Sequence, residues 1–157
     1  MIEISTFLKV GNDFLNIYDY DGELDDDFYV EGALELSINN TTLIDKSMWD
    51  CIDQLWCYFV EGLMLISKNE EFRTNFPDQP IEVTFTPVKK HVLISVKANV
   101  QKKVFIERDI FIAYMASHAK KFLSKLITIG NANVNAYMPY IHDVDILLEK
   151  YPLIKFD

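Results

Sequence analysis

The spacing of apolar residues switches between two periods along the chain, and this limits the folds that the chain can adopt. Apolar and polar residues alternate, as in strands with one buried face, in residues 2–10, 28–38, 81–85, 92–100 and 104–106. Apolar residues recur every three or four positions, as in amphipathic helices, in residues 48–66 and 110–129. The chain therefore contains two strand-rich blocks, each of which ends in a long helix.

Turn residues separate the elements within each block. The composition of residues 11–13 predicts a hairpin into a second strand over 14–20. Gly32 falls on the apolar face of its strand and predicts a bulge or a close approach by another element. Pro77 and Pro80 fix two φ angles and favour a loop around them. Turns or loops are expected at 21–27, 39–42, 70–80, 101–103 and 131–139.

The order of the elements predicts an α+β protein with antiparallel sheets. It reads βββα-βββα, followed by a short helix over 141–151, and lacks the strand-helix alternation that builds a parallel sheet. We expect the two long helices to pack on one face of the sheets. No linker rich in Gly, Ser or Pro divides the chain, so we expect residues 1–157 to form one globular domain.

The net charge of −9 is distributed unevenly. Residues 1–61 hold 14 acidic residues against Lys9 and Lys46, a balance of −12, whereas residues 62–157 hold 13 basic and 10 acidic residues, a balance of +3. A protein this acidic suits neither phosphate backbones nor anionic membranes unless its cations gather in one place. Lys89, Lys90, Lys102 and Lys103 lie near expected hairpin turns, where lysine discourages edge pairing. We therefore expect no nucleic-acid partner and no membrane partner.

Six carboxylates lie within nine residues of the acidic half, next to several tyrosines. Acids interleaved with tyrosines combine electrostatic steering with rigid aromatic anchors, so this segment predicts a docking surface for a basic protein. Asp50, Asp53 and Glu61 are expected to extend it along the first long helix, together with a tryptophan. The predicted partner-binding residues are Tyr18, Asp19, Tyr20, Asp21, Glu23, Asp25, Asp26, Asp27, Tyr29 and Trp49.

Two other interpretations of the acidic segment stay open. A solvated loop that self-repulsion keeps extended needs no partner. An irregular cation site is the other interpretation, but an EF-hand is excluded because Leu24 and Val30 stand where its glycine and glutamate belong.

Residues for catalysis or metal binding are not grouped in the sequence. The three histidines, His91, His118 and His142, fall in different segments, and His118 lies on an apolar helix face. Cys51 and Cys57 are six residues apart on the expected helix, on different faces, which suits neither a disulfide nor a zinc site. Nucleophile-elbow and phosphate-loop motifs are absent. We predict no catalytic residue, no metal site and no cofactor, although a pair of carboxylates for acid-base chemistry stays open.

These observations predict a non-enzymatic protein-binding module with an acidic, aromatic-bearing surface. The cytoplasm is the expected compartment, because a secretory signal is absent and the cysteine spacing suits free thiols. In size and charge the chain resembles immunity proteins, which neutralise basic toxin domains in bacteria, and the resemblance implies such an inhibitor. One alternative is a small enzyme or ligand binder with a pocket between sheet and helices near Tyr114 or His118. Another is a homo-oligomer in which the acidic half of one copy meets the basic half of another.

Overall fold

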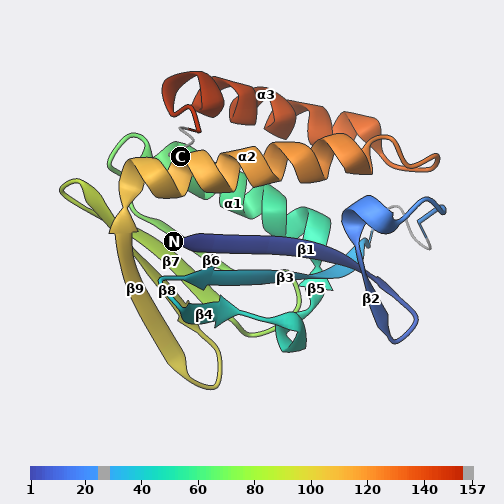
Figure 1. The fold of residues 1–157 in the computed structure, drawn as a ribbon, viewed down its shortest axis with the longest axis horizontal. Helices are drawn as coiled ribbons and strands as arrows, with labels where there is room; N and C mark the ends of the chain where they lie inside the picture. The colour runs from blue at the N-terminus through green and yellow to red at the C-terminus, as the bar shows by residue number, and fades with distance from the viewer. Residues whose placement is uncertain (25–28, 154–157) are drawn as a thin grey trace.

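The computed structural model describes residues 1–24 and 29–153 and contains two antiparallel sheets and three helices (Figure 1). The first sheet consists of β1 (Ile2–Val10), β2 (Asp13–Asn16), β3 (Glu31–Ile38), β4 (Thr41–Ile44) and β5 (Asp50–Cys51). The second consists of β6 (Phe72–Asn75), β7 (Glu82–Val88), β8 (His91–Lys97) and β9 (Gln101–Glu107). The helices are α1 (Ile52–Ile66), α2 (Arg108–Leu126) and α3 (Val134–Lys150), with 3-10 turns η1 (Ile17–Asp19) and η2 (Lys46–Met48). The predicted α+β class is confirmed.

The two sheets have simple antiparallel orders. The first sheet runs β2-β1-β3-β4, with β5 paired to the start of β3, and the second runs β6-β7-β8-β9. Register in the first sheet is set by β1 and β3, which pair from Ile2 with Ile38 to Leu8 with Gly32. A Cβ on Gly32 would lie 2.2 Å from the carbonyl oxygen of Phe7, so the close approach expected at this glycine is present.

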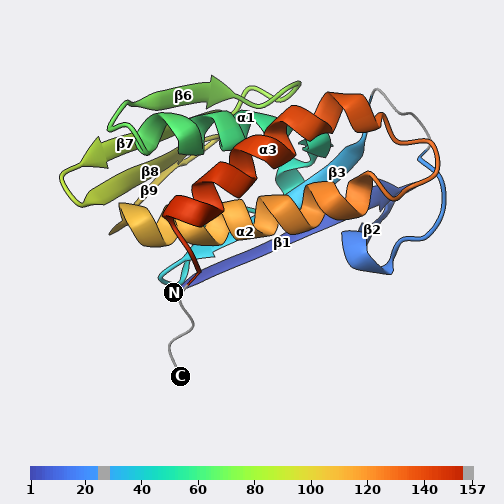
Figure 2. The ribbon, with the colours of Figure 1, turned by 90° about the horizontal axis from the view of Figure 1, so that it is seen from above.

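The helices lie above the sheets with α3 uppermost (Figure 1), and seen from above α3 runs across α1 and α2 (Figure 2). α1 contacts β3, β6 and β7, and α2 contacts β1, β8 and β9. α3 packs on the outer side of α1 and α2 (Figure 1). Aromatic rings fill the space between sheets and inner helices, where the pocket of the ligand-binding alternative was expected. Less than 2% of each of these side chains is exposed: Trp56, Phe59, Phe85, Phe111 and Phe122.

The hydroxyl of Thr6 joins β1 to both inner helices. The indole Nε1 of Trp56 donates a hydrogen bond of 3.0 Å to Thr6 Oγ1, which lies 2.8 Å from Nε2 of His118. The rings of Trp56 and His118 stack with their centroids 5.2 Å apart. Burial, assisted by the nearby charge of Lys121, lowers the pKa of His118 to about 4, so the imidazole is neutral at pH 7.

Several predicted element boundaries in the first half were wrong. Local hydrogen bonds and strand pairing make one strand end earlier, and the first helix begin later, than the sequence predicted. The strand expected over 14–20 ends at Asn16, whose side chain accepts the N–H of Tyr18 and starts η1. The helix expected from residue 48 begins at Ile52, because the Asp45 side chain caps η2 and residues 50–51 pair with β3.

In the second half, pairing and packing override the local sequence signals. The expected loop 70–80 contains β6, which pairs with β7, and residues 101–103 belong to β9 rather than to a turn. The last helix spans 17 residues rather than the short segment expected over 141–151, and it contains Pro139. Pro139 is exposed, so water can bond the carbonyl oxygen that its ring leaves without a helical partner.

Acidification is expected to lower the free energy of unfolding as the pH falls from 6.5 towards 4. In this range His118 takes up a proton in the unfolded chain but not in the core, which amounts to at most about 3 kcal/mol by pH 4. The variant His118→Gln keeps a polar group beside Thr6 and cannot titrate. Urea unfolding at several pH values should show that the free energy of unfolding varies less with pH in the variant than in the wild type. Parallel pH profiles would contradict the lowered pKa of His118.

Candidate partner-binding surface

The predicted partner-binding residues are divided between two places in the structure. The side chains of Tyr18, Tyr29 and Trp49 are 47%, 57% and 39% exposed, which is unusual for large rings. Tyr18 lies on η1, which packs against α2, whereas Tyr29 leads into β3 and Trp49 into β5. Three predicted residues, Asp25, Asp26 and Asp27, lie outside the described residues. The remaining acids, Asp19, Asp21 and Glu23, are exposed.

A cavity of about 250 Å³ brings two of the predicted tyrosines together. Tyr20 and Tyr29 both line it, although they are nine positions apart in the chain. The hydroxyl of Tyr20 donates a hydrogen bond to the carbonyl oxygen of Glu23 and closes the intervening turn, while the Asn131 side chain bonds both backbone groups of Leu24. Among the described residues, the lining consists of Leu8, Lys9, Val10, Gly11, Tyr20, Leu24, Tyr29, Val30 and Glu31.

Lys9 connects this cavity to Trp49. Its ammonium nitrogen lies 4.7 Å from the centre of the Trp49 ring, donates to the Gly11 carbonyl oxygen at 2.8 Å and lies 3.8 Å from the Glu31 carboxylate. An ammonium over a tryptophan face is attracted by the ring quadrupole. We call Lys9, Tyr20, Tyr29, Glu31 and Trp49 the tyrosine-tryptophan surface.

The only two lysines of residues 1–61 are both engaged with β3. Lys9 lies near Glu31, while Lys46 lies 3.4 Å from Glu35 and over the ring of Phe7 at 4.3 Å. Neither forms an ion pair with the described acids of residues 18–24. The negative charge beside the tyrosine-tryptophan surface is therefore not neutralised from within the acidic half.

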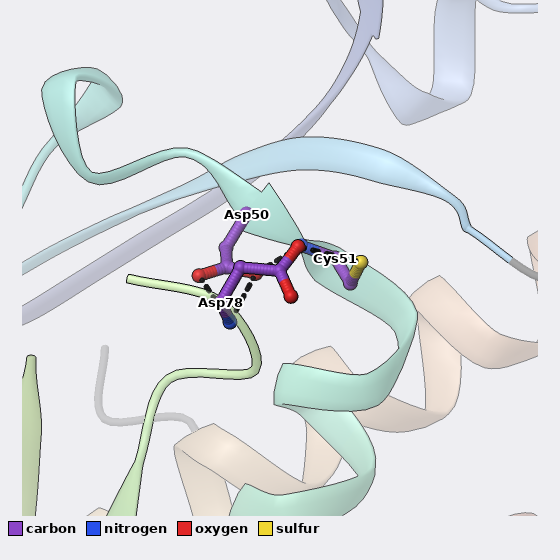
Figure 3. A group of neighbouring side chains, drawn as sticks. All are labelled: Asp50, Cys51 and Asp78. Carbon is purple, nitrogen blue, oxygen red and sulfur yellow. Dashed lines mark hydrogen bonds between the residues drawn. The ribbon is translucent and has the colours of Figure 1, made fainter. Parts of the chain in front are cut away.

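The backbone of Trp49 is anchored from the loop at 76–80. The side-chain amide of Gln79 donates to the Trp49 carbonyl oxygen. The next residue, Asp50, is only 3% exposed, and its carboxylate accepts the backbone N–H groups of Cys51 at 2.6 Å and Asp78 at 3.1 Å (Figure 3). It also accepts the backbone N–H of Gln79 at 2.8 Å. The expectation that Asp50 extends the acidic surface was wrong, because these donors hold it inside the fold.

Asp50, Cys51 and Asp78 form the one group of potential metal ligands in the described part of the chain, with ligand atoms within 4.8 Å of one another (Figure 3). Backbone donors already occupy both Asp50 oxygens. Burial, with the charges of Asp78 and Asp50, raises the pKa of the Cys51 thiol to about 12, so the reactive thiolate is disfavoured. The arrangement fits an anchor for the loop better than a metal site or a nucleophile.

Asp53 is the second acid that the helical pattern placed wrongly on the surface. It is 5% exposed, its Oδ2 accepts a 2.8 Å hydrogen bond from the hydroxyl of Tyr137 on α3, and its buried Oδ1 has no partner among the described residues. Burial raises the pKa of this carboxyl, although its hydrogen bonds oppose the shift. Asp53 thus joins α1 to α3 by a hydrogen bond, although burying its negative charge lowers the free energy of unfolding.

A larger groove of about 780 Å³ lies at the other end of β1. Phe105 and Tyr114, which are 54% and 40% exposed, lie on it together with Lys150 at the end of α3 and residues 151–153 that follow this helix. Tyr114, one of the two residues suggested for a ligand pocket, is therefore on a groove. His118, the other, is in the core beside Thr6.

Comparison with known proteins identified no relative of this chain. No protein-family model, no curated protein and no solved structure matches this chain. Among the described residues, none of the helices combines the length and the apolar character needed to cross a membrane.

Asp53→Asn is expected to flatten the part of the stability profile that falls with rising pH. Because the folded-state pKa of Asp53 lies above its ordinary value of 3.8, the wild type loses stability as the pH rises through that interval. The amide of the variant stays neutral throughout and keeps an acceptor for Tyr137. Chemical unfolding of wild type and variant between pH 4 and 8 measures the difference.

The control for this prediction is Tyr137→Phe, which removes the donor and leaves the acid. It should cost about 1–3 kcal/mol at pH 8, where the carboxylate loses a charge-assisted hydrogen bond, and less at pH 4. If the free energies of unfolding of the wild type and Asp53→Asn differ by the same amount at every pH, the raised pKa of Asp53 is contradicted.

Proposed function

We propose that this chain is a non-enzymatic cytoplasmic module that binds a basic protein through the tyrosine-tryptophan surface. The observation that carries the proposal is the pairing of exposed rings, of which Trp49 is held by its neighbours, with acids that no lysine of the same half neutralises. Trp49 is 39% exposed even though Gln79 and Lys9 hold it in place. An inhibitor of the immunity type, directed against a basic toxin domain, is the specific form of the proposal.

The two components have different roles in binding. Exposed carboxylates accelerate the encounter with a cationic partner and make it sensitive to salt. Aromatic side chains supply most of the energy once water has left the interface, and rings that are already fixed lose little entropy on binding. Trp49, which Lys9 and Gln79 contact, fits the second role, and the exposed ring of Tyr29 adds aromatic area to it. Asp19, Asp21 and Glu23 fit the first role.

The state of the reactive side chains also supports a binding role. Burial raises the pKa of both thiols, Cys51 and Cys57, to about 12, and the neutral imidazole of His118 packs in the core. Each of these groups is thus engaged in packing or hydrogen bonding rather than placed beside the exposed rings.

Small-ligand binding is a second candidate function, favoured by the groove near Phe105 and Tyr114. Its volume of about 780 Å³ is within the range of roughly 300–1,000 Å³ that small-molecule sites occupy. The proposal for a protein partner is preferred because it uses both the charge asymmetry and the anchored rings.

Capture from an extract of the source cells tests the proposed function. Immobilised wild type should retain a basic protein at low salt and release it as salt rises. The double variant Tyr29→Ala/Trp49→Ala should lose that protein, because truncating central rings typically costs about 2 kcal/mol or more each, roughly a thirtyfold loss of affinity per ring.

The matched control is Phe105→Ala/Tyr114→Ala, which removes two comparably exposed rings from the other groove. It should retain the same basic protein as the wild type. A protein lost only by the control, or one bound equally by all three baits, would contradict the proposal, and recovery of the chain itself would favour the homo-oligomer.

A further inference from the structure

We propose that the cavity between Tyr20 and Tyr29 is a socket for one arginine side chain of the partner. This inference rests on the proposed function and deepens it, since it names the chemical group that the surface recognises. The volume of about 250 Å³ equals the share of roughly eight water molecules in the liquid, comparable to the number of heavy atoms in an arginine side chain.

The walls of the cavity match the parts of such a side chain. Leu8, Leu24 and Val30 are each at least nine-tenths buried and provide an apolar base for the methylene stem. Tyr20 and Tyr29 also line the cavity, and aromatic groups at this position attract a guanidinium that enters it. The socket therefore has both an apolar part and a cation-stabilising part.

Glu31 supplies the charge at the rim of the socket. Its side chain is 49% exposed and lies 3.8 Å from Lys9, beyond hydrogen-bonding distance, so its oxygens can still accept a forked pair of hydrogen bonds. Arginine presents such a fork, whereas lysine presents a single point charge. The geometry of the rim thus favours arginine over lysine.

The charge around the socket is negative even when Lys9 is counted. Among the described residues from 17 to 31, four are acidic (Asp19, Asp21, Glu23 and Glu31) and none is lysine or arginine. Lys9 itself is directed to the Trp49 ring and the Gly11 carbonyl oxygen, so this surface already holds one cation between a ring and a carboxylate. A second cation entering beside it would still meet excess negative charge.

Titration with capped amino acids tests the socket without the partner. The probes are Nα-acetyl-arginine amide, Nα-acetyl-lysine amide and Nα-acetyl-norleucine amide, followed by the backbone amide signals of the 15N-labelled protein. The arginine probe should give saturable shifts at Leu8, Gly11 and Val30 with a Kd in the millimolar range, about −4 kcal/mol. The lysine probe should bind more weakly, and the norleucine probe should leave these signals unchanged.

Two glutamate variants separate the socket from general electrostatics. Glu31→Gln should weaken arginine binding about fivefold, the upper value for an exposed ion pair. Glu35→Gln is the matched control, because Glu35 lies on the same strand, is similarly exposed and pairs with Lys46, yet does not line the cavity. Equal effects of the two variants, equal shifts from norleucine, or shifts confined to other residues would overturn the socket.

The outcome is distinguishable from failure of the proposed function. If the probe does not bind but a captured basic protein still requires Tyr29 and Trp49, the socket is wrong and the module stands. If arginine amide binds as described but no basic protein is captured, the socket stands and the proposed function fails.

Discussion

The buried hydroxyl of Thr6 is the interaction on which the rest of the fold depends. It accepts the indole N–H of Trp56 and contacts the imidazole of His118, so one side chain of β1 meets α1 and α2 at once. A polar group at this depth is costly unless bonded, and its two partners also stack on each other. The position of β1 under the helices is therefore specified by hydrogen bonds as well as by packing.

This fixed position of β1 determines what the outer surface presents. Side chains alternate along a strand, so Thr6 and Leu8 in the core require Lys9 to point to the other face, where it meets Trp49 and Glu31. A slip of one residue would reverse this arrangement. Asp50 completes the support by holding the backbone next to Trp49 against residues 78–79. The candidate surface is thus a direct product of the core and of one buried carboxylate.

The parts of the structure that follow from local periodicity were predictable from the sequence. The alternation over 28–38 corresponds to β3, which begins only at Glu31, and the three-to-four spacing over 110–129 corresponds to α2, which spans Arg108–Leu126. The parts that depend on distant residues were not. The sequence pattern predicted Asp50 and Asp53 to be exposed acids at the start of a helix. Residues 78–79 cover Asp50 and Tyr137 on α3 covers Asp53, and neither contact is visible in the local sequence. β6 carries no strong alternation and exists because β7 pairs with it.

The candidate surface was predictable in type but not in arrangement. The composition of residues 18–29 indicated acids beside tyrosines, but not that Tyr20 and Tyr29 share a cavity while Tyr18 lies on η1. The role of Lys9 had no signal at all, because its contact with Trp49 joins residues 40 positions apart. The fates of the histidines and cysteines also depend on distant residues: His118 and Cys57 lie in the core, whereas Cys51 lies beside Asp50 and Asp78.

Hydrogen-deuterium exchange of the chain, alone and bound to its captured partner, examines the proposed surface most directly. The proposal requires slowed exchange on binding at the amides of Lys9 to Gly11, Tyr20 and Glu31, with no change in β9 or the start of α2. Protection confined to the groove at Phe105 and Tyr114, with unchanged exchange around Lys9 and Glu31, would contradict it.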